Sequence, residues 1–373
     1  MTRPAKVVHL TSFHPPLDTR LFYREIRTVA AAGYDVVLIA PGERDEVVDD
    51  VPIRAIPRSR SRLGRLLTTI WQVHSAALRE GARLYHFHDP ELIPVGVLLK
   101  LCGKRVIYDV HEDVPRQLRT WYFIPAALRG PLAALTEAVE RLAARVFDGV
   151  VVATPAIAAR FPGPKTVTVQ NFPIADELAA PWALPYADRS AVLAYVGGTS
   201  EIRGIKEMVE AMGLLPEGLG ARLKLGSAGF VPPELGDEVR RMPGWRRCEL
   251  LGWQDRAGVA RLLGEAKAGL VVLHPTRNHI DSYPVKLFEY MAAGIPVIAS
   301  DFPIWRDVVE GAGCGLLVDP LDATAVARAI RRLLEDPAEA EAMGRRGRET
   351  VHTTYNWTAQ GRKLVAFYAW LLG

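Results

Sequence analysis

The sequence predicts an α/β protein made of two doubly wound domains, each with a parallel sheet, and three observations support this. The first half alternates short apolar runs with amphipathic stretches, starting with a strand at 6–10, a helix at 21–32 and a strand at 35–40. The same alternation starts again with an apolar run at 192–196. The chain has 373 residues, 49% of them apolar, which is enough for two domain cores.

The composition excludes several classes of protein. The three cysteines, Cys102, Cys248 and Cys314, lie far apart and lack the spacing of a disulfide framework or a zinc site, which fits a reducing cytosol. The apolar run near the N-terminus is too short for a signal peptide, and no run approaches the length of a membrane span. The formal net charge of +4 is too small to indicate a nucleic-acid partner. We therefore expect a cytoplasmic protein that binds no nucleic acid.

In the first half, polar residues follow the ends of predicted strands. The loop that contains His14 and Asp18 follows the first strand. Asp89 follows a later strand, and His111 and Glu112 follow the next. The carboxyl ends of parallel strands form the edge where open α/β sheets bind ligands, so these residues are candidates for a binding site. The further strands of this half are expected at 51–56, 84–87, 105–108, 148–153 and 167–169, with helices at 91–101 and 131–146.

Two features of this region leave alternatives open. His111 is either a residue of the binding site or is satisfied locally, within a structural turn that Asp109 caps. The first strand is not followed by a G-x-G-x-x-G motif, which makes a nicotinamide site a weak interpretation. We therefore expect no cofactor.

Basic and aromatic residues gather in two segments of the first half. Between residues 51 and 79 there are six arginines and no acid, and large apolar residues recur at helical spacing from Leu63 to Trp71. A second cluster, at 121–124, is aromatic and flanked by arginines. A basic amphipathic helix can lie on an anionic membrane, which suggests peripheral contact at the inner face of the membrane. The alternative is a helix packed in the core behind a solvated, arginine-rich loop.

The second half begins with a strand that opens into a glycine turn. Gly197 and Gly198 follow the strand at 192–196, and a helix begins near Gly204. Glycines at such a place let backbone N–H groups approach a phosphate, and Arg203 adds a cation. The remaining strands are expected at 221–225, 249–251 and 269–273, and the final helices at 322–334, 338–351 and 355–372.

The stretch from 281 to 300 predicts a loop, a helix that Pro284 starts, and a buried strand. Asp281 and Glu289 stand at either end of its first half, with seven residues between them. A carboxylate on a mainly apolar helix needs a partner. Glu289 either pairs with Lys286, one turn earlier, or accepts hydrogen bonds from the hydroxyl groups of a ligand.

This stretch resembles the E-x7-E signature of the family-4 retaining glycosyltransferases, which have the GT-B fold of two Rossmann-like domains facing a cleft. The resemblance implies that Glu289 binds the ribose hydroxyls of a donor nucleotide. It implies that Asp281, in place of the usual Glu, contacts the donor sugar, and that His111 contacts this sugar from the N-terminal domain. The catalytic residues would then be His111, Asp281 and Arg203.

The resemblance also assigns residues to the donor diphosphate and to the acceptor. Family members usually carry an arginine where this chain has Gly198, while Arg203 and Gly204 stand for the family's Lys-Gly pair. Lys286 is a candidate to replace the missing cation. The expected donor-binding residues are Gly197, Gly198, Arg203, Lys286 and Glu289, with Leu251 near the base and His274 near a phosphate or the sugar. The expected acceptor-side residues are His14, Asp18, Asp89 and Glu112.

The resemblance implies an N-terminal acceptor-side domain at 1–175, a linker at 176–190, a nucleotide-sugar-binding domain at 191–352 and a helix at 353–373 that packs back on the first domain. The expected reaction moves a sugar from a nucleotide-diphosphate donor to a hydroxyl of a carbohydrate or lipid-linked acceptor, with retention of configuration, in polysaccharide or glycolipid assembly. No D-x-D triad occurs, so we expect the enzyme to need no metal. The alternatives are a nucleotide-sugar 2-epimerase of the same fold and a non-catalytic nucleotide-sugar-binding protein.

Overall fold

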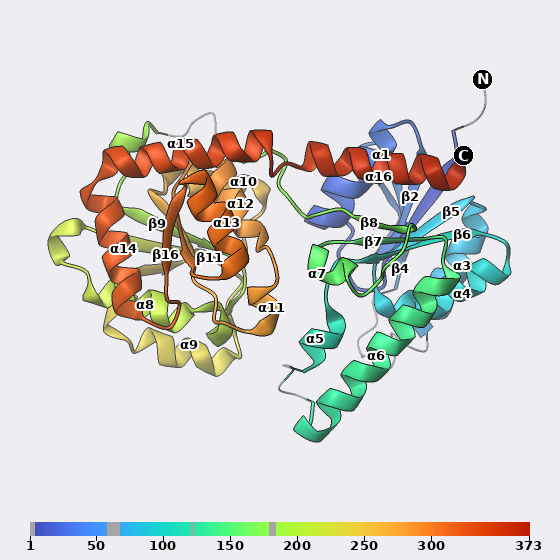
Figure 1. Ribbon diagram of the computed structural model, residues 1–373, viewed down its shortest axis with the longest axis horizontal. Helices are drawn as coiled ribbons and strands as arrows, with labels where there is room; N and C mark the ends of the chain where they lie inside the picture. Colours follow the sequence, from blue (N-terminus) through green and yellow to red (C-terminus); the bar gives the residue numbers. More distant parts are fainter. Residues whose placement is uncertain (1–3, 58–67, 120, 122–123, 179–183) are drawn as a thin grey trace. The chain divides into compact units, whose positions relative to one another are not determined.

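The computed structural model describes residues 4–57, 68–119, 121, 124–178 and 184–373. The chain divides into two compact units (Figure 1). The first consists of Met1–Asn171 together with Thr358–Gly373, and the second of Phe172–Trp357. The division therefore lies a few residues before the expected end of the first domain, and the described residues of the expected linker belong to the second unit.

The described part of the first unit contains one eight-stranded sheet. Its strands are parallel except for the edge strand β3, which runs antiparallel to β4. Because β1, β5 and β6 are neighbours, the segments that follow them meet at one edge of the sheet. The strand order is β3 (Glu46–Val48), β4 (Val51–Ile56), β2 (Asp35–Pro41), β1 (Lys6–Leu10), β5 (Leu84–Phe87), β6 (Arg105–Val110), β7 (Gly149–Val152) and β8 (Thr166–Thr168).

Helices cover this sheet and agree with the predicted pattern, with one clear difference. The longest of them, α6, begins at Ala126, whereas the sequence predicted a start at Pro131. A proline inside a helix leaves the carbonyl four residues earlier without a partner, and here Ala127 is exposed, so water can bond to it. Apart from α16 (Trp357–Leu372), the helices in the described part of this unit are η1 (Thr19–Ile26), α1 (Arg27–Ala31), α3 (Ile70–Glu80), η3 (Pro90–Leu92), α4 (Ile93–Leu101), α5 (Val114–Leu118), α6 (Ala126–Val146) and α7 (Pro155–Ala158).

The last helix, α16 (Trp357–Leu372), packs in the first unit. Its Tyr368 is completely buried and bonds to His86, and Phe367 lies so close to Gly149 of β7 that a Cβ there would approach its ring to 2.6 Å. The expectation that the final helix returns to the first domain is confirmed.

The described part of the second unit is built on a sheet of six parallel strands. One layer of the core lies under α8 (Ile205–Leu214) and α14 (Ala323–Glu335). The other lies under α10 (Arg256–Glu265), α12 (Val285–Ala292) and α13 (Pro303–Ala312), so helices cover both faces of the sheet. The sheet order is β13 (Cys248–Leu250), β11 (Arg222–Gly226), β9 (Val192–Val196), β14 (Ala268–Val271), β15 (Val297–Ser300) and β16 (Gly315–Val318), while β10 (Thr199–Ser200) pairs with β12 (Phe230–Val231).

The predicted unit at 281–300 folds as expected, with α12 running into β15. Within the described chain, no helix has both the length and the apolar composition that crossing a membrane requires. The helices of the second unit are η4 (Tyr186–Asp188), η5 (Glu201–Arg203), α8 (Ile205–Leu214), η6 (Glu217–Leu219), α9 (Pro233–Arg240), η7 (Pro243–Arg247), α10 (Arg256–Glu265), α11 (Arg277–Ile280), α12 (Val285–Ala292), α13 (Pro303–Ala312), α14 (Ala323–Glu335) and α15 (Pro337–Thr353).

Candidate functional site

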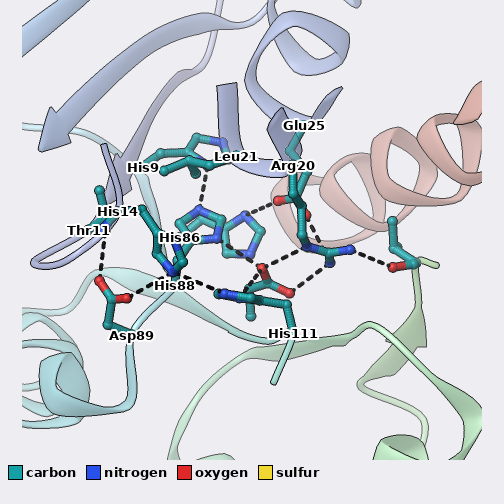
Figure 2. Close-up of polar contacts among 12 residues, drawn as sticks. His9, Thr11, His14, Arg20, Leu21, Glu25, His86, His88, Asp89 and His111 are labelled. Carbon is teal, nitrogen blue, oxygen red and sulfur yellow. Dashed lines mark hydrogen bonds and ion pairs between the residues drawn. The ribbon is translucent and has the colours of Figure 1, made fainter. Parts of the chain in front are cut away.

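The carboxyl edge of the first sheet gathers three of the residues singled out from the sequence (Figure 2). His14 comes from the loop after β1, Asp89 follows β5, and His111 follows β6. The Nε2 atom of His14 lies 3.3 Å from Oδ1 of Asp89 and 3.1 Å from Nε2 of His111. The structure therefore joins these three side chains into one polar cluster.

The pair of Asp89 and His14 is charged at neutral pH. Burial opposes the charge on Asp89, but His14, the backbone N–H of Ser12 and the hydroxyl of Thr11 lower the pKa of this carboxyl to about 2. Burial also opposes protonation of His14, yet the hydrogen bond and charge of Asp89 outweigh it and raise its pKa to about 9. The single N–H on Nε2 of His14 faces both Asp89 and Nε2 of His111, so Nε2 of His111 is an acceptor and the proton of His111 lies on Nδ1, next to Asp109.

This pair makes stability depend on pH in a defined direction. Because the pKa of His14 rises from 6.5 to about 9 on folding, its contribution is complete below pH 6.5 and is lost as the pH rises through 9. Urea unfolding should show His14→Gln less stable than the wild type by about 3 kcal/mol at pH 6, with the difference shrinking toward pH 10. A difference that stays constant from pH 6 to pH 10 would contradict the ion pair.

Asp109 is the buried centre of the cluster. It accepts hydrogen bonds from Nδ1 of His111 at 3.2 Å and Nδ1 of His88 at 2.9 Å, and Arg20 pairs with its other oxygen at 3.0 Å. Burial would raise the pKa of Asp109, but the charge of Arg20 and the two imidazoles hold it well below its usual range. Arg20 also pairs with the fully buried Glu25 at 2.9 Å, and burial raises the pKa of Glu25 well above its usual range.

A chain of hydrogen bonds continues from Asp109 into the core. His88 Nε2 bonds to His9 Nδ1 at 2.9 Å, and His9 Nε2 lies 3.2 Å from the hydroxyl of Tyr368 on α16. That hydroxyl also bonds to His86 at 2.6 Å. Burial, and next the neighbouring His88, lower the pKa values of His9 and His86 well below the usual value, so both rings are neutral. The sequence did not predict this chain.

A cavity of about 380 Å³ opens beside the cluster. His14, Asp89 and His111 line it, together with Glu112 and three aromatic residues, Phe13, Tyr108 and Trp121. Aromatic faces pack against sugar rings, and carboxylates accept hydrogen bonds from hydroxyl groups. Asp18, by contrast, caps η1: its Oδ1 accepts hydrogen bonds from the backbone N–H groups of Arg20 and Leu21 at 2.8 and 2.9 Å.

In the second unit, two cations converge on the glycine turn after β9. Gly197 has a φ of +125°, a conformation that favours glycine. A Cβ placed there would lie 3.1 Å from Nζ of Lys286 and 3.7 Å from a guanidinium nitrogen of Arg203, and one on Gly198 would lie 3.5 Å from the same nitrogen. The structure therefore brings Gly197, Gly198, Arg203 and Lys286 together.

The ammonium of Lys286 is buried and has no hydrogen-bond partner among the described residues. It lies 3.7 Å above the ring centroid of Tyr195, whose hydroxyl donates to the carbonyl of Gly198 at 2.6 Å. Burial, and then the charge of Arg203, lower the pKa of Lys286 well below its usual value. A buried cation without a partner is costly, and an anion bound at the turn would remove that cost.

Glu289 has a partner that sequence reasoning missed. Glu289 is buried, with 8% of its side chain exposed, and its Oε1 accepts a hydrogen bond from Arg256 of α10 at 2.7 Å. Arg256 also forms two hydrogen bonds to Glu177, at 2.9 and 2.6 Å. Burial opposes the charge of Arg256, but the two carboxylates raise its pKa. The structure therefore pairs Glu289 with Arg256, where the sequence had suggested Lys286 or a ligand.

The other donor-side candidates have separate surroundings. Asp281 is half-buried and follows α11. His274 Nε2 lies 3.0 Å from a carboxylate oxygen of Glu207, and its carbonyl lies 3.0 Å from Nδ1 of His279. The backbone of Leu251 bonds to Leu225 at the end of β13. Burial lowers the pKa of His279, which the sequence did not predict as a site residue; its hydrogen bond to the carbonyl of His274 opposes this shift, and the charge of Arg203 adds to it.

Two groups of metal-ligand side chains occur among the described residues of the first unit. One contains His9, Glu25, His86 and His88, and the other contains His88, Asp109 and His111; in each group the ligand atoms lie within 4.8 Å of one another. Hydrogen bonds already join His9 to His88, and His88 and His111 to Asp109. We interpret both groups as a hydrogen-bonded network, and metal independence stays a prediction.

Comparison with protein-family models shows which family the chain belongs to. The model described as "Glycosyl transferases group 1" matches residues 178–350, and the model described as "Glycosyl transferase 4-like domain" matches residues 19–169. This chain belongs to the group 1 glycosyltransferases. It is a glycosyltransferase enzyme, and its two parallel-sheet units are those of the GT-B fold.

Two curated proteins and one solved structure illustrate what this chain is similar to. A glycogen synthase of Mycobacterium tuberculosis is 24% identical over 367 residues, covering 88% of this chain and 85% of that protein. A phosphatidyl-myo-inositol mannosyltransferase of Mycobacterium leprae is 27% identical over 292 residues, covering 70% of this chain and 72% of that protein. The structure of Anabaena HepE in complex with UDP-glucose has a TM-score of 0.73 and 14% identity, covering 98% of this chain and 99% of HepE.

Proposed function

We propose that this glycosyltransferase moves a sugar from a nucleotide-diphosphate sugar to a hydroxyl group, with retention of configuration. The observation that carries the proposal is the buried ammonium of Lys286, which has no hydrogen-bond partner among the described residues and lies beside Arg203 and the Gly197–Gly198 turn. Two cations and a glycine turn at the end of a strand suit a diphosphate, which must leave when the sugar is transferred. The complex of HepE with UDP-glucose supports this class of donor.

Each residue then has a role in the transfer. Lys286 and Arg203 neutralise the charge that develops on the leaving diphosphate, and Glu289 holds the ribose hydroxyls. His111 and Asp281 contact the donor sugar. The acceptor hydroxyl attacks the anomeric carbon from the face that the diphosphate leaves, and the departing phosphate takes the acceptor proton. The sugar–phosphate bond breaks as the new glycosidic bond forms on the same face, which retains the configuration.

The acceptor belongs, in this proposal, in the cavity of the first unit. Its aromatic residues and the carboxylates of Asp89 and Glu112 suit a carbohydrate, free or linked to a lipid. The mannosyltransferase relative is named for a phosphatidyl lipid, which supports a lipid-linked acceptor and peripheral contact with the inner face of the membrane. The basic segment that suggested this contact lies largely outside the described residues, because 58–67 and 122–123 are not described.

An acceptor-dependence assay tests the reaction. Nucleoside diphosphate should be released from the correct donor only when an acceptor is present, and proton NMR should show the donor's anomeric configuration in the product. Release of diphosphate together with a free epimerised sugar, without an acceptor, would instead support the 2-epimerase. An inverted product would contradict retention.

Removing the Glu289 carboxylate should weaken nucleotide binding. We expect Glu289→Ala to lower the affinity for the donor's nucleoside diphosphate by about tenfold or more, because the ribose hydroxyls lose their acceptor. Isothermal titration calorimetry measures this, with Glu310→Ala, an exposed acid of α13, as the matched control. Unchanged affinity in Glu289→Ala would remove Glu289 from the donor site.

A further inference from the structure

Helix α6 carries an exposed apolar stripe along its whole length. Its other side packs against the unit through Ala133, Ala143 and Ala144, so the stripe does not belong to the core. Surface helices normally turn polar residues outward, and contiguous exposed apolar residues mark an interaction surface. The apolar stripe consists of Leu128, Leu132, Leu135, Val139, Leu142 and Val146, whose exposed fractions lie between 38% and 62%. In Figure 1, α6 runs beside α5 and extends beyond the sheet of its unit.

The basic and acidic side chains of α6 differ in how exposed they are. Neither acid of the helix is fully exposed: Glu140 is buried and pairs with Arg160, and Glu137, whose side chain is 30% exposed, pairs with Arg141 at 2.7 Å. Arg141 and Arg145, one turn apart, are exposed beside the apolar stripe. The outward side of α6 therefore presents apolar residues and positive charge, with no fully exposed acid.

A pocket of about 390 Å³, lined by basic residues, adjoins the C-terminal end of α6. Arg141, Arg145, Arg160 and Lys165 line it, and its described lining contains no acid. Arg160 is held by Asp113 and Glu140, and the ammonium of Lys165 donates to the carbonyls of Arg145 and Phe147. Arg145 and Arg141 are therefore the groups that an incoming phosphate would meet, because both are exposed, although Arg141 also pairs with Glu137. Guanidinium groups suit phosphate oxygens.

We propose that α6 docks the protein on an anionic phospholipid surface. The apolar stripe enters the boundary between head groups and acyl chains, and Arg141 and Arg145 contact lipid phosphates. Pairing with a second copy fits the charges less well, because the residues flanking the stripe include Arg129 and Arg145 and no exposed acid that could form ion pairs across the interface. This proposal rests on the membrane contact of the proposed function and places that contact on α6. Its test measures lipid binding and not sugar transfer, so the docking proposal and the proposed reaction can fail independently.

Vesicle flotation tests this surface. The full chain should float with vesicles of phosphatidylcholine and phosphatidylserine, and much less with phosphatidylcholine alone. The variant Leu135→Gln/Val139→Gln/Leu142→Gln should lose about tenfold or more of this binding. Arg141→Gln/Arg145→Gln should lose about fivefold per arginine and with it the preference for phosphatidylserine. All five positions are exposed, so thermal unfolding should show both variants folded.

Leu101→Gln is the matched control, because Leu101 is 79% exposed at the end of another helix of the same unit. It should bind vesicles as the wild type does. Absence of vesicle binding by the wild type, or equal binding by the stripe variant, would overturn the proposal. A wild-type dimer in light scattering that the stripe variant converts to a monomer, without vesicle binding, would show that the occupant is a second copy of the chain.

Discussion

Replacing Lys286 with methionine should lower kcat/KM for the nucleotide-diphosphate sugar by about 10²–10³-fold while making the protein more resistant to urea. Activity falls because the departing diphosphate loses a cation. Stability rises, by about 1–3 kcal/mol, because the free protein no longer buries an ammonium that has no hydrogen-bond partner among the described residues. Steady-state kinetics and urea unfolding of the same preparation measure both changes.

Lys206→Met is the control for this prediction. Lys206 lies on α8 near the same turn, but its ammonium already pairs with Glu201 at 3.2 Å and Glu238 at 2.9 Å. It should keep nearly full activity and should not gain stability. If Lys286→Met were as active as Lys206→Met, the ammonium of Lys286 would have no part in stabilising the diphosphate.

Asp109→Asn should lower kcat by about 10²-fold or more with little change in KM. Asparagine has nearly the same shape, but it removes the charge that balances Arg20 and replaces one of the two acceptor oxygens that serve Arg20, His88 and His111 with an NH2 donor. Leaving Arg20 with fewer partners in a buried site should also cost about 3 kcal/mol of unfolding free energy. The pH profile of kcat should shift as well, which a purely structural effect would not produce.

Asp148→Asn is the matched control in the same sheet. Asp148 is partly exposed, precedes β7, and pairs with Lys100 at 2.9 Å away from the cluster. It should leave kcat and its pH profile unchanged. Two results would show that Asp109 does not position His111. One is an equal loss of activity in both variants, and the other is a loss of activity in Asp109→Asn that the loss of unfolding free energy fully accounts for.

The sequence predicted the fold well because its strands are short, buried and apolar. The strands at Leu84–Phe87 and Val192–Val196 lie where the apolar runs of the sequence predicted them. The strand β3 was missed because it is a three-residue edge strand with mostly exposed residues and no alternation to detect. The start of α6 was placed too late because Pro131 is usual in a first turn and here lies in the second.

The candidate sites were predictable only where local signals exist. His14, Asp89 and His111 follow strand ends, so the topology of a parallel sheet brings them together. The partners of these residues come from far along the chain: Arg20 is 89 residues from Asp109, and His9 is 359 residues from Tyr368. No pattern in one sequence pairs such side chains. The same holds for Arg256, which approaches Glu289 from a different helix.

Calorimetric titration with UDP, GDP, ADP and TDP tests the central claim most directly. We predict that the wild type binds one of the four in preference to the others, and that Lys286→Met weakens this binding by at least about tenfold while Lys206→Met does not. The preferred nucleotide would then name the base of the donor. If none of the four bound, or if Lys286→Met bound as tightly as the wild type, the glycine turn and its cations would not be a diphosphate site.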